Sequence, residues 1–160
     1  MDDDLHQLAL KLAVHLSSNK LVLATAESCT GGWLAKVLTD IPGSSGWFER
    51  GYVTYSNASK IDMLGVLPQT LEIWGAVSEQ TVREMAEGAL RRSRGNLAVS
   101  ISGIAGPAGG SADKPVGTVW FSWAGLHQQT KVLNGSFRGD RNAVRRQAVV
   151  TALEGLFGFE

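Results

Sequence analysis

The sequence predicts an α/β fold with helices on both faces of a mostly parallel sheet. Short apolar runs typical of buried strands alternate with stretches of helical periodicity through residues 1–102. The end of the chain instead carries two strand-like runs joined by a short polar turn, which favours an antiparallel pair. Because 160 residues is the size of one domain, we expect residues 1–160 to form a single domain of about five strands.

The first elements follow from apolar spacing. A helix is expected over residues 5–19, where leucines and alanines recur at helical period behind three aspartates. The apolar run Leu21–Thr25 predicts a buried strand, and helical period returns over Trp33–Ile41. The stretch TAESCTGG at residues 25–32 is therefore expected to turn from a strand into a helix.

The next elements complete the alternation. GYVTYS at residues 51–56 predicts a second strand, and Ser78 is expected to cap a helix whose apolar face includes residues 82–90. LAVSIS at residues 97–102 predicts a third strand.

The end of the chain begins with the glycine-rich stretch GIAGPAGGSADKP at residues 103–115, which is expected to be a loop. Strands are expected over residues 116–124 and 131–137, and Asp140 should cap a final helix.

Composition limits the class of protein. Lysine and arginine number 15, and aspartate and glutamate also number 15, so we expect no nucleic-acid partner and no anionic membrane surface. The single cysteine, Cys29, cannot form an intramolecular disulfide, and the acidic N-terminus is unlike a signal peptide. No apolar run approaches the roughly 20 residues of a membrane-spanning helix. These features predict a soluble, cytoplasmic protein.

The unusual residue clusters of this sequence follow its expected strands. Parallel strands place their C-terminal ends along one edge of a sheet, and open α/β sheets bind ligands at that edge. The loops that would meet there are residues 28–32, residues 55–60, the glycine-rich loop and FRGDR at residues 137–141. The last of these requires the fifth strand to run parallel to the third.

Ser28 is the candidate nucleophile. Backbone N–H groups around Thr30 and Gly31, at the start of the following helix, could stabilise an oxyanion. The histidines lie on the first helix and in a distant turn, and there is no Gly-x-Ser-x-Gly elbow, so a Ser-His-Asp triad is not expected. The alternative is that Ser28 is only a helix N-cap. Cys29 is disfavoured because a lone cysteine is usually a small buried hydrophobe.

The proton acceptor would then be a lysine or a tyrosine, and residues 55–60 offer Tyr55 and Lys60. To act as a base near neutral pH, Lys60 needs a pKa well below the usual ~10.4, which burial in a water-poor cleft could supply. The protonated amine could then give its proton to a leaving amine, as amide hydrolysis requires. The alternatives are that Lys60 is a solvated helix residue and that Tyr55 fills the sheet edge. Asn57 is a candidate binding residue and a natural cap for the short helix around residues 61–64.

Two loops are candidate phosphate sites. The backbone of Gly106, Gly109 and Gly110 would be open to a phosphate, although this loop can also be a simple crossover. Arg141 and Arg145, one helical turn apart, are possible phosphate ligands. One cysteine and three scattered histidines give no metal-ligand spacing, so we predict neither a metal nor a cofactor.

At these loops the sequence resembles the CinA C-terminal domain family. The resemblance runs from about residue 24 to about residue 152, in order and spacing, and far exceeds the specificity of any single motif. It rests on six blocks: TAESCTGGWLAKVLTDIPGSS, FERGYVTYSNASK, LGV, GAVSE, SISGIAGPAGGSADKPVGTVW and FRGDRNAVRRQA. The family fold is a three-layer α/β/α sandwich with a mixed sheet, and its members typically form homodimers.

The resemblance also implies an activity. Stand-alone members include nicotinamide-nucleotide amidohydrolases, which hydrolyse the carboxamide of nicotinamide mononucleotide to nicotinic acid mononucleotide and ammonia in pyridine-nucleotide recycling. The family's catalytic serine, tyrosine and lysine fall on Ser28, Tyr55 and Lys60. Longer relatives carry an N-terminal nucleotide-processing domain with pyrophosphatase activity. A chain of 160 residues leaves no room for it, so that activity is not expected.

These residues suggest a mechanism and a rival. We expect Ser28 to attack the carboxamide carbon while Lys60 takes its proton, directly or through Tyr55, and N–H groups near Thr30 and Gly31 hold the oxyanion. Ammonia would leave with a proton from Lys60, and water would hydrolyse the acyl-enzyme. The rival is a catalytically silent paralogue, a nucleotide-binding or partner-binding module in which Ser28 and Lys60 only contact a ligand.

Overall fold

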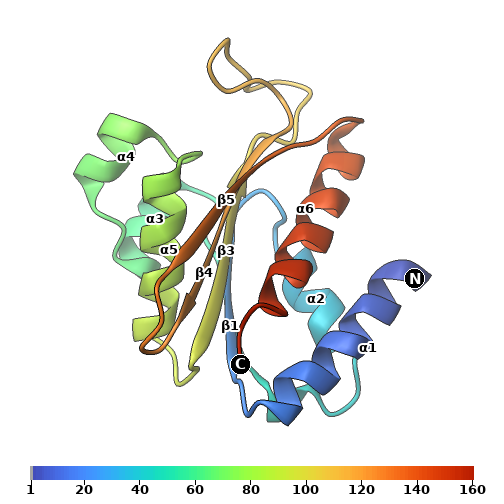
Figure 1. Ribbon diagram of the computed structural model, residues 1–160. Helices are drawn as coiled ribbons and strands as arrows, with labels where there is room; N and C mark the ends of the chain where they lie inside the picture. Colours follow the sequence, from blue (N-terminus) through green and yellow to red (C-terminus); the bar gives the residue numbers. More distant parts are fainter. Residues whose placement is uncertain (1) are drawn as a thin grey trace.

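A five-stranded sheet runs through the centre of the molecule, as the computed structural model of residues 2–160 shows (Figure 1). β1 pairs in parallel with β2 and with β3, whereas β4 pairs antiparallel with β3 and with β5. β5 therefore runs in the same direction as β1, β2 and β3, which confirms the mixed, mostly parallel sheet. In spatial order the strands are β2 (Phe48–Val53), β1 (Leu23–Glu27), β3 (Leu97–Gly103), β4 (Thr118–Gly125) and β5 (Lys131–Ser136).

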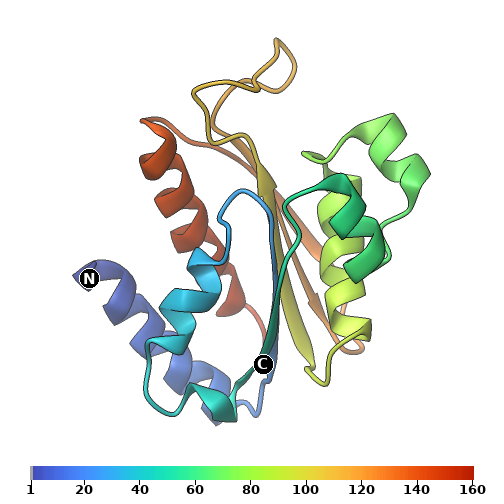
Figure 2. The same ribbon diagram turned by 180° about the vertical axis from the view of Figure 1, so that it is seen from behind.

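Helices cover both faces of the sheet, which confirms the three-layer sandwich (Figures 1 and 2). A short 3₁₀ helix, η1 (Ser44–Gly46), leads into β2. One face carries α1 (Asp3–Ser18), α2 (Trp33–Thr39) and α6 (Arg141–Leu156), and the other carries α3 (Asn57–Leu64), α4 (Pro68–Trp74) and α5 (Glu79–Arg91).

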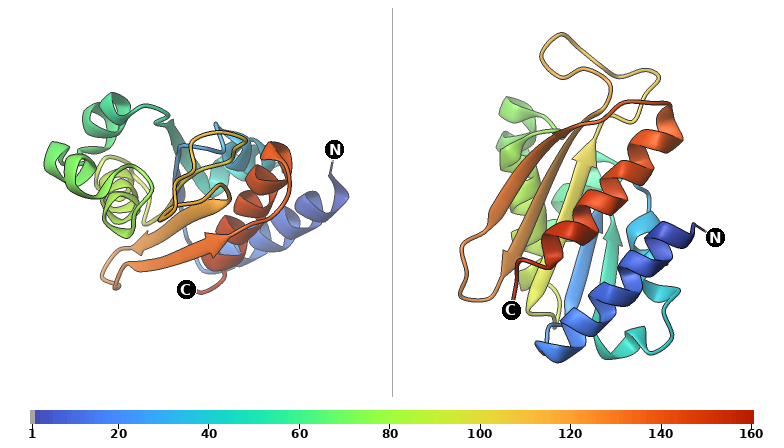
Figure 3. Two further views of the ribbon diagram at one scale, coloured as in Figure 1. Left: turned by 90° about the horizontal axis from the view of Figure 1, so that it is seen from above. Right: turned by 45° about the vertical axis from the view of Figure 1, so that its right-hand side comes forward.

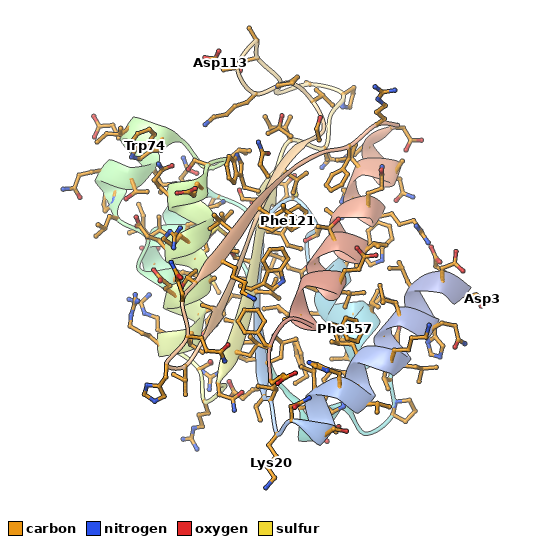
Figure 4. The ribbon with its side chains drawn as sticks, viewed as in Figure 1. Asp3, Lys20, Trp74, Asp113, Phe121 and Phe157 are labelled. Carbon is orange, nitrogen blue, oxygen red and sulfur yellow. The ribbon has the colours of Figure 1, made fainter. Side chains whose placement is uncertain are left out.

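The two faces of the sheet differ in side-chain size. On β3, Leu97 and Val99 belong to the larger core beside α1, α2 and α6, whereas Ala98 belongs to the core beside α5. The small residues allow α5 to pack closely, and the Ser100 hydroxyl donates a hydrogen bond of 2.6 Å to the carbonyl oxygen of Val82 in that helix. Phe121 of β4 fills the larger core, between the sheet and α6 (Figure 4).

The helix caps agree with the sequence analysis. The Ser78 side chain accepts a hydrogen bond from the N–H of Thr81 at the start of α5, and Asp140 does the same for Ala143 at the start of α6. Both predicted caps are confirmed. Each cap satisfies a backbone N–H of the first turn and so fixes the residue at which its helix begins.

Several strand boundaries differ from the expected ones, and one helix was not expected. β1 begins two residues later than the apolar run Leu21–Thr25, and β2 begins at Phe48, before the predicted 51–56. Strand limits follow inter-strand pairing, which apolar content alone does not show. α4 was not expected, because its seven residues are too short for a clear helical period; Pro68 stands at its first turn, where a missing N–H costs nothing.

The glycine-rich loop extends past the end of the sheet (Figures 1 and 3). At its end, Gly117 has φ +96°, and a Cβ there would lie 2.1 Å from the carbonyl oxygen of Phe137, so only glycine fits. Lys114 donates a 2.6 Å hydrogen bond to the carbonyl oxygen of Trp74, at the end of α4. Trp74 and Asp113 lie at this end of the molecule (Figure 4). Within residues 2–160, no helix is long and apolar enough to cross a membrane.

Candidate active site

Strand pairing continues past the ends of β1 and β2 and brings two loops together. The N–H of Ser28 donates to the carbonyl oxygen of Ile101 at 3.0 Å, and the N–H of Thr54 donates to that of Glu27 at 2.8 Å. Ser28 is therefore held at the edge of the sheet beside Thr54. The predicted meeting of the first two loops is confirmed.

Lys60 reaches the same edge from α3. Ser56, at the N-cap, and Ser59 form a reciprocal capping box, which fixes the first turn of the helix directly after β2. Lys60 and Leu64, four residues apart, make up its buried face, and Lys60 is only 1% exposed. The alternative of a solvated Lys60 is wrong. So is the assignment of Asn57 as the cap, because Asn57 is the first helical residue and lies exposed.

The Lys60 amine contacts three oxygen atoms. Its Nζ lies 3.1 Å from the Ser28 Oγ, 2.9 Å from the carbonyl oxygen of Thr54 and 3.4 Å from that of Tyr55. Lys60 forms no salt bridge with any carboxylate in the described part of the chain. Burial therefore lowers the pKa of the amine, since the charged form loses its water without gaining an anion.

This arrangement fits a neutral lysine. Carbonyl oxygens can only accept hydrogen bonds, so the two N–H groups of a neutral amine are used by Thr54 and Tyr55. The nitrogen lone pair is then left for the hydroxyl hydrogen of Ser28. The geometry suits proton transfer from Ser28 to Lys60.

Ser28 lies in a tight turn and not at a helix N-cap. The N–H of Gly31 donates to the carbonyl oxygen of Ser28 at 3.0 Å, and α2 begins only at Trp33, with Gly32 at its N-cap. The alternative of Ser28 as a helix cap is wrong. The expectation that Thr30 to Gly32 open the helix is also wrong, because two glycines with positive φ place the turn before it.

Glu27 binds the N-terminus of α2, where the sequence analysis expected backbone N–H groups to be free to stabilise an oxyanion. It is 1% exposed, and its carboxylate accepts hydrogen bonds from the backbone N–H groups of Leu34 at 2.9 Å and Ala35 at 3.0 Å. The Thr30 hydroxyl adds a third at 2.7 Å. The sequence signal for this contact is a glutamate at the end of an apolar run, seven residues before Leu34 in the first turn of the next helix. The sequence analysis did not select Glu27.

The turn nevertheless offers backbone donors. The N–H groups of Cys29 and Thr30 donate to no backbone carbonyl among residues 2–160, whereas that of Gly31 is used within the turn. The Cys29 thiol is buried, and burial raises its pKa to about 11. A thiol held neutral is a poor nucleophile, which favours Ser28.

A cavity of about 240 Å³ opens above this edge of the sheet. Its lining combines the predicted site residues with positions that the sequence analysis did not select. Ser102, at the end of β3, is 1% exposed and has no hydrogen-bond partner for its hydroxyl in the described chain. The lining residues are Ser28, Cys29, Tyr55, Lys60, Ala76, Val77, Ser102, Gly103, Ala105, Gly106, Ala108 and Arg141.

Arg141 joins three parts of the cavity rim. Its Nη1 donates to the carbonyl oxygen of Gly106 at 2.8 Å, and its Nη2 donates to the Tyr55 hydroxyl at 3.1 Å. Tyr55 is 62% exposed, and its phenol is bound to Arg141, whereas Lys60 contacts Ser28 directly. Of the two expected proton routes, the geometry favours the direct one.

The other predicted binding residues lie outside the cavity. Thr30 and Gly31 line a separate, open hollow of about 490 Å³ together with Arg145. Gly109 and Gly110 are exposed further out on the glycine-rich loop, where a Cβ on Gly110 would lie 2.7 Å from the backbone nitrogen of Val116. Of the candidate phosphate ligands, only Gly106 and Arg141 border the cavity.

Comparison with known proteins identifies a family and similar proteins for this chain. The profile of the CinA C-terminal domain matches residues 5–159. The chain is 56% identical to the nicotinamide-nucleotide amidohydrolase PncC of Escherichia coli K12, over 98% of this chain and 94% of that protein, and 50% identical to PncC of Pseudomonas putida, over 96% of each. The crystal structure of the competence/damage inducible protein CihA from Agrobacterium tumefaciens superposes with a TM-score of 0.96 at 45% identity, covering 99% of this chain and 96% of that one. The chain belongs to the CinA C-terminal domain family.

Proposed function

We propose that this protein hydrolyses the carboxamide of nicotinamide mononucleotide to nicotinic acid mononucleotide and ammonia. The observation that carries the proposal is the contact between the buried Lys60 amine and the Ser28 hydroxyl at the floor of the cavity. The PncC relatives, at 50–56% identity over nearly the full chain, support the reaction and the substrate.

The first half of the reaction is acyl transfer to Ser28. Lys60 takes the hydroxyl proton while Ser28 Oγ bonds to the carboxamide carbon, and the N–H of Cys29, which borders the cavity, stabilises the oxyanion. The carbon–nitrogen bond then breaks, and the nitrogen takes the proton from Lys60 and leaves as ammonia. Lys60 is neutral again and removes a proton from water, whose oxygen bonds to the acyl carbon. The bond from that carbon to Ser28 Oγ then breaks, Lys60 returns the proton to Oγ, and the acid is released.

The rim residues position the rest of the nucleotide. Arg141 lies at the cavity mouth, where its guanidinium can bind a phosphate, and its hydrogen bond to the carbonyl oxygen of Gly106 holds it there. Ser102 faces the cavity with an unpaired hydroxyl, which can bind the carboxamide or the ring that carries it. The apolar Ala76 and Val77 form the opposite wall.

The test is an ammonia assay with purified protein. Nicotinamide mononucleotide is incubated with the protein in the presence of a chelator, and ammonia and nicotinic acid mononucleotide are measured together. We expect equal amounts of both from the wild-type protein, and neither above background from Ser28→Ala. Tight nucleotide binding by calorimetry with background ammonia would instead identify a binding module and overturn the proposal.

A further inference from the structure

The turn that carries Ser28 is held by Arg145 of α6. The Arg145 Nε donates to the carbonyl oxygen of Cys29 at 3.0 Å, and its Nη2 donates to that of Thr30 at 3.2 Å. The guanidinium lies over the Trp33 ring, with its Cζ 5.7 Å from the ring centroid. Two hydrogen bonds in the plane of the guanidinium and an aromatic surface together fix its orientation.

Peptide geometry extends this contact to the candidate oxyanion donors. The peptide bond between Cys29 and Thr30 is trans, so the Thr30 N–H points away from the Cys29 carbonyl oxygen that Arg145 holds. In the same way, the bond from Gly31 N–H to the Ser28 carbonyl oxygen turns the Cys29 N–H outward. Neither of these two N–H groups donates to a backbone carbonyl within residues 2–160.

Thr30 is anchored from a second direction. Its hydroxyl donates to the buried carboxylate of Glu27 at 2.7 Å, while its carbonyl oxygen accepts from Arg145. The side chain of Thr30 is thus bound to β1 and its backbone to α6. Thr30 is fully buried. Rotation of the Cys29–Thr30 peptide plane would break contacts on both sides.

We propose that Arg145 is a positioning residue that holds the Cys29–Thr30 turn, and with it the Ser28 hydroxyl and the Cys29 N–H at the cavity, in the orientation that the reaction needs. This inference rests on the proposed function. Preorganised donors stabilise the transition state without rearranging during the reaction, so a loosened peptide should slow the reaction and leave substrate binding intact. Arg145 thereby has a role different from that of a phosphate ligand, which would act on substrate affinity.

The first test compares Arg145→Met with Arg146→Met. Arg146 stands next to Arg145 in α6 but pairs with Asp2 at the start of α1, so its variant removes the same charge without touching the turn. With nicotinamide mononucleotide, we expect kcat of Arg145→Met to fall about 10²-fold at nearly constant KM, and Arg146→Met to keep the wild-type values. A raised KM at constant kcat, or no change in either constant, would overturn the proposal.

The second test uses an acyl donor without phosphate. p-Nitrophenyl acetate would acylate Ser28 with release of p-nitrophenolate, and the burst rate needs the same oxyanion donor. We expect the burst of Arg145→Met to fall by a factor similar to its loss in kcat, and that of Ser28→Ala to disappear. An unchanged burst in Arg145→Met would show that Arg145 acts on the nucleotide and would refute the positioning role.

Arg145→Lys keeps the positive charge. It is a second variant that separates a loss of activity from a loss of folding, should Arg145→Met be unstable. A lysine lacks the planar, rigid pair of N–H groups with which the guanidinium holds both carbonyl oxygens, so we expect a partial loss of kcat with a wild-type unfolding temperature. Full activity in Arg145→Lys would contradict the proposal. If the wild-type protein gave a Ser28-dependent burst but released no ammonia, nicotinamide mononucleotide would be ruled out as the substrate. The burst would still test the role of Arg145. A wild type with neither reaction would overturn both proposals.

Discussion

The Lys60 amine lies 3.1 Å from the Ser28 hydroxyl, although the two residues are 32 positions apart in the chain. Ser28 follows β1, and Lys60 lies on the helix that follows β2, so the parallel pairing of these two strands creates the contact. The contact requires a lysine to be buried without a carboxylate partner, which costs free energy. The same burial lowers the pKa of the amine, which can therefore accept a proton.

The nucleophile is tested by two neighbouring substitutions. Ser28→Ala removes the atom that contacts Lys60, and we expect ammonia release to fall about 10³-fold or more. Cys29→Ala should keep most of the activity, because the Cys29 thiol is buried and its pKa is raised to about 11. Single-turnover assays of both variants measure the difference, and full activity in Ser28→Ala would refute the assignment.

Lys60→Met should abolish amide hydrolysis and raise stability. Because burial lowers the Lys60 pKa in the folded state, the unfolded chain binds more protons between that pKa and the ordinary value of ~10.4, and stability rises with pH across this window. Below the window, the folded protein bears the full cost of a buried charge. The gain from Lys60→Met should therefore be largest below the lowered pKa of Lys60 and should shrink towards pH ~10.4.

Urea unfolding of wild type and Lys60→Met at a series of pH values measures this gain. Lys11→Met is a suitable control, because Lys11 is an exposed lysine on α1 whose charge is solvated. If Lys60→Met proved less stable than the wild type at every pH, the hydrogen bonds of the amine would outweigh its burial, contrary to this account.

Tyr55→Phe should weaken substrate binding more than it slows chemistry. The Tyr55 hydroxyl accepts a hydrogen bond from Arg141, and Lys60 reaches Ser28 without it. Loss of the hydroxyl frees the Arg141 side chain at the cavity mouth, and we expect KM to rise about tenfold with a smaller change in kcat. Steady-state kinetics decide the point: a fall in kcat as large as that of Lys60→Met would place Tyr55 in the proton route.

Gly88→Ala should destabilise the protein and reduce activity through α3. A Cβ on Gly88 of α5 would lie 2.0 Å from the carbonyl oxygen of Leu64, on the same helix face as Lys60. We expect a loss of roughly 1–3 kcal/mol in the free energy of unfolding, because α3 must move outward. Gly46→Ala is the matched control, since no atom lies within 4 Å of its Cβ position. Equal stabilities for the two variants would contradict this packing.

Periodicity and strand order were enough to predict the layers and the edge at which the loops meet. The chain pattern β-α-β-α-β requires this edge and places Ser28 and Lys60 at it, whereas Arg141 also requires the fifth strand to run parallel to the third. The orientation of individual groups did not follow. Glu27 and Ser102 act through burial and hydrogen bonding, which depend on tertiary packing, and a pattern of residue types shows neither.

The covalent step is tested most directly by partition between water and hydroxylamine during hydrolysis of nicotinamide mononucleotide. If Ser28 carries the acyl group and its formation limits the rate, hydroxylamine should divert product from nicotinic acid mononucleotide to the hydroxamate while the rate of ammonia release stays constant. Absence of the hydroxamate at concentrations of hydroxylamine that leave the protein folded would mean that water attacks the carboxamide directly. That result would contradict the role of Ser28 as nucleophile.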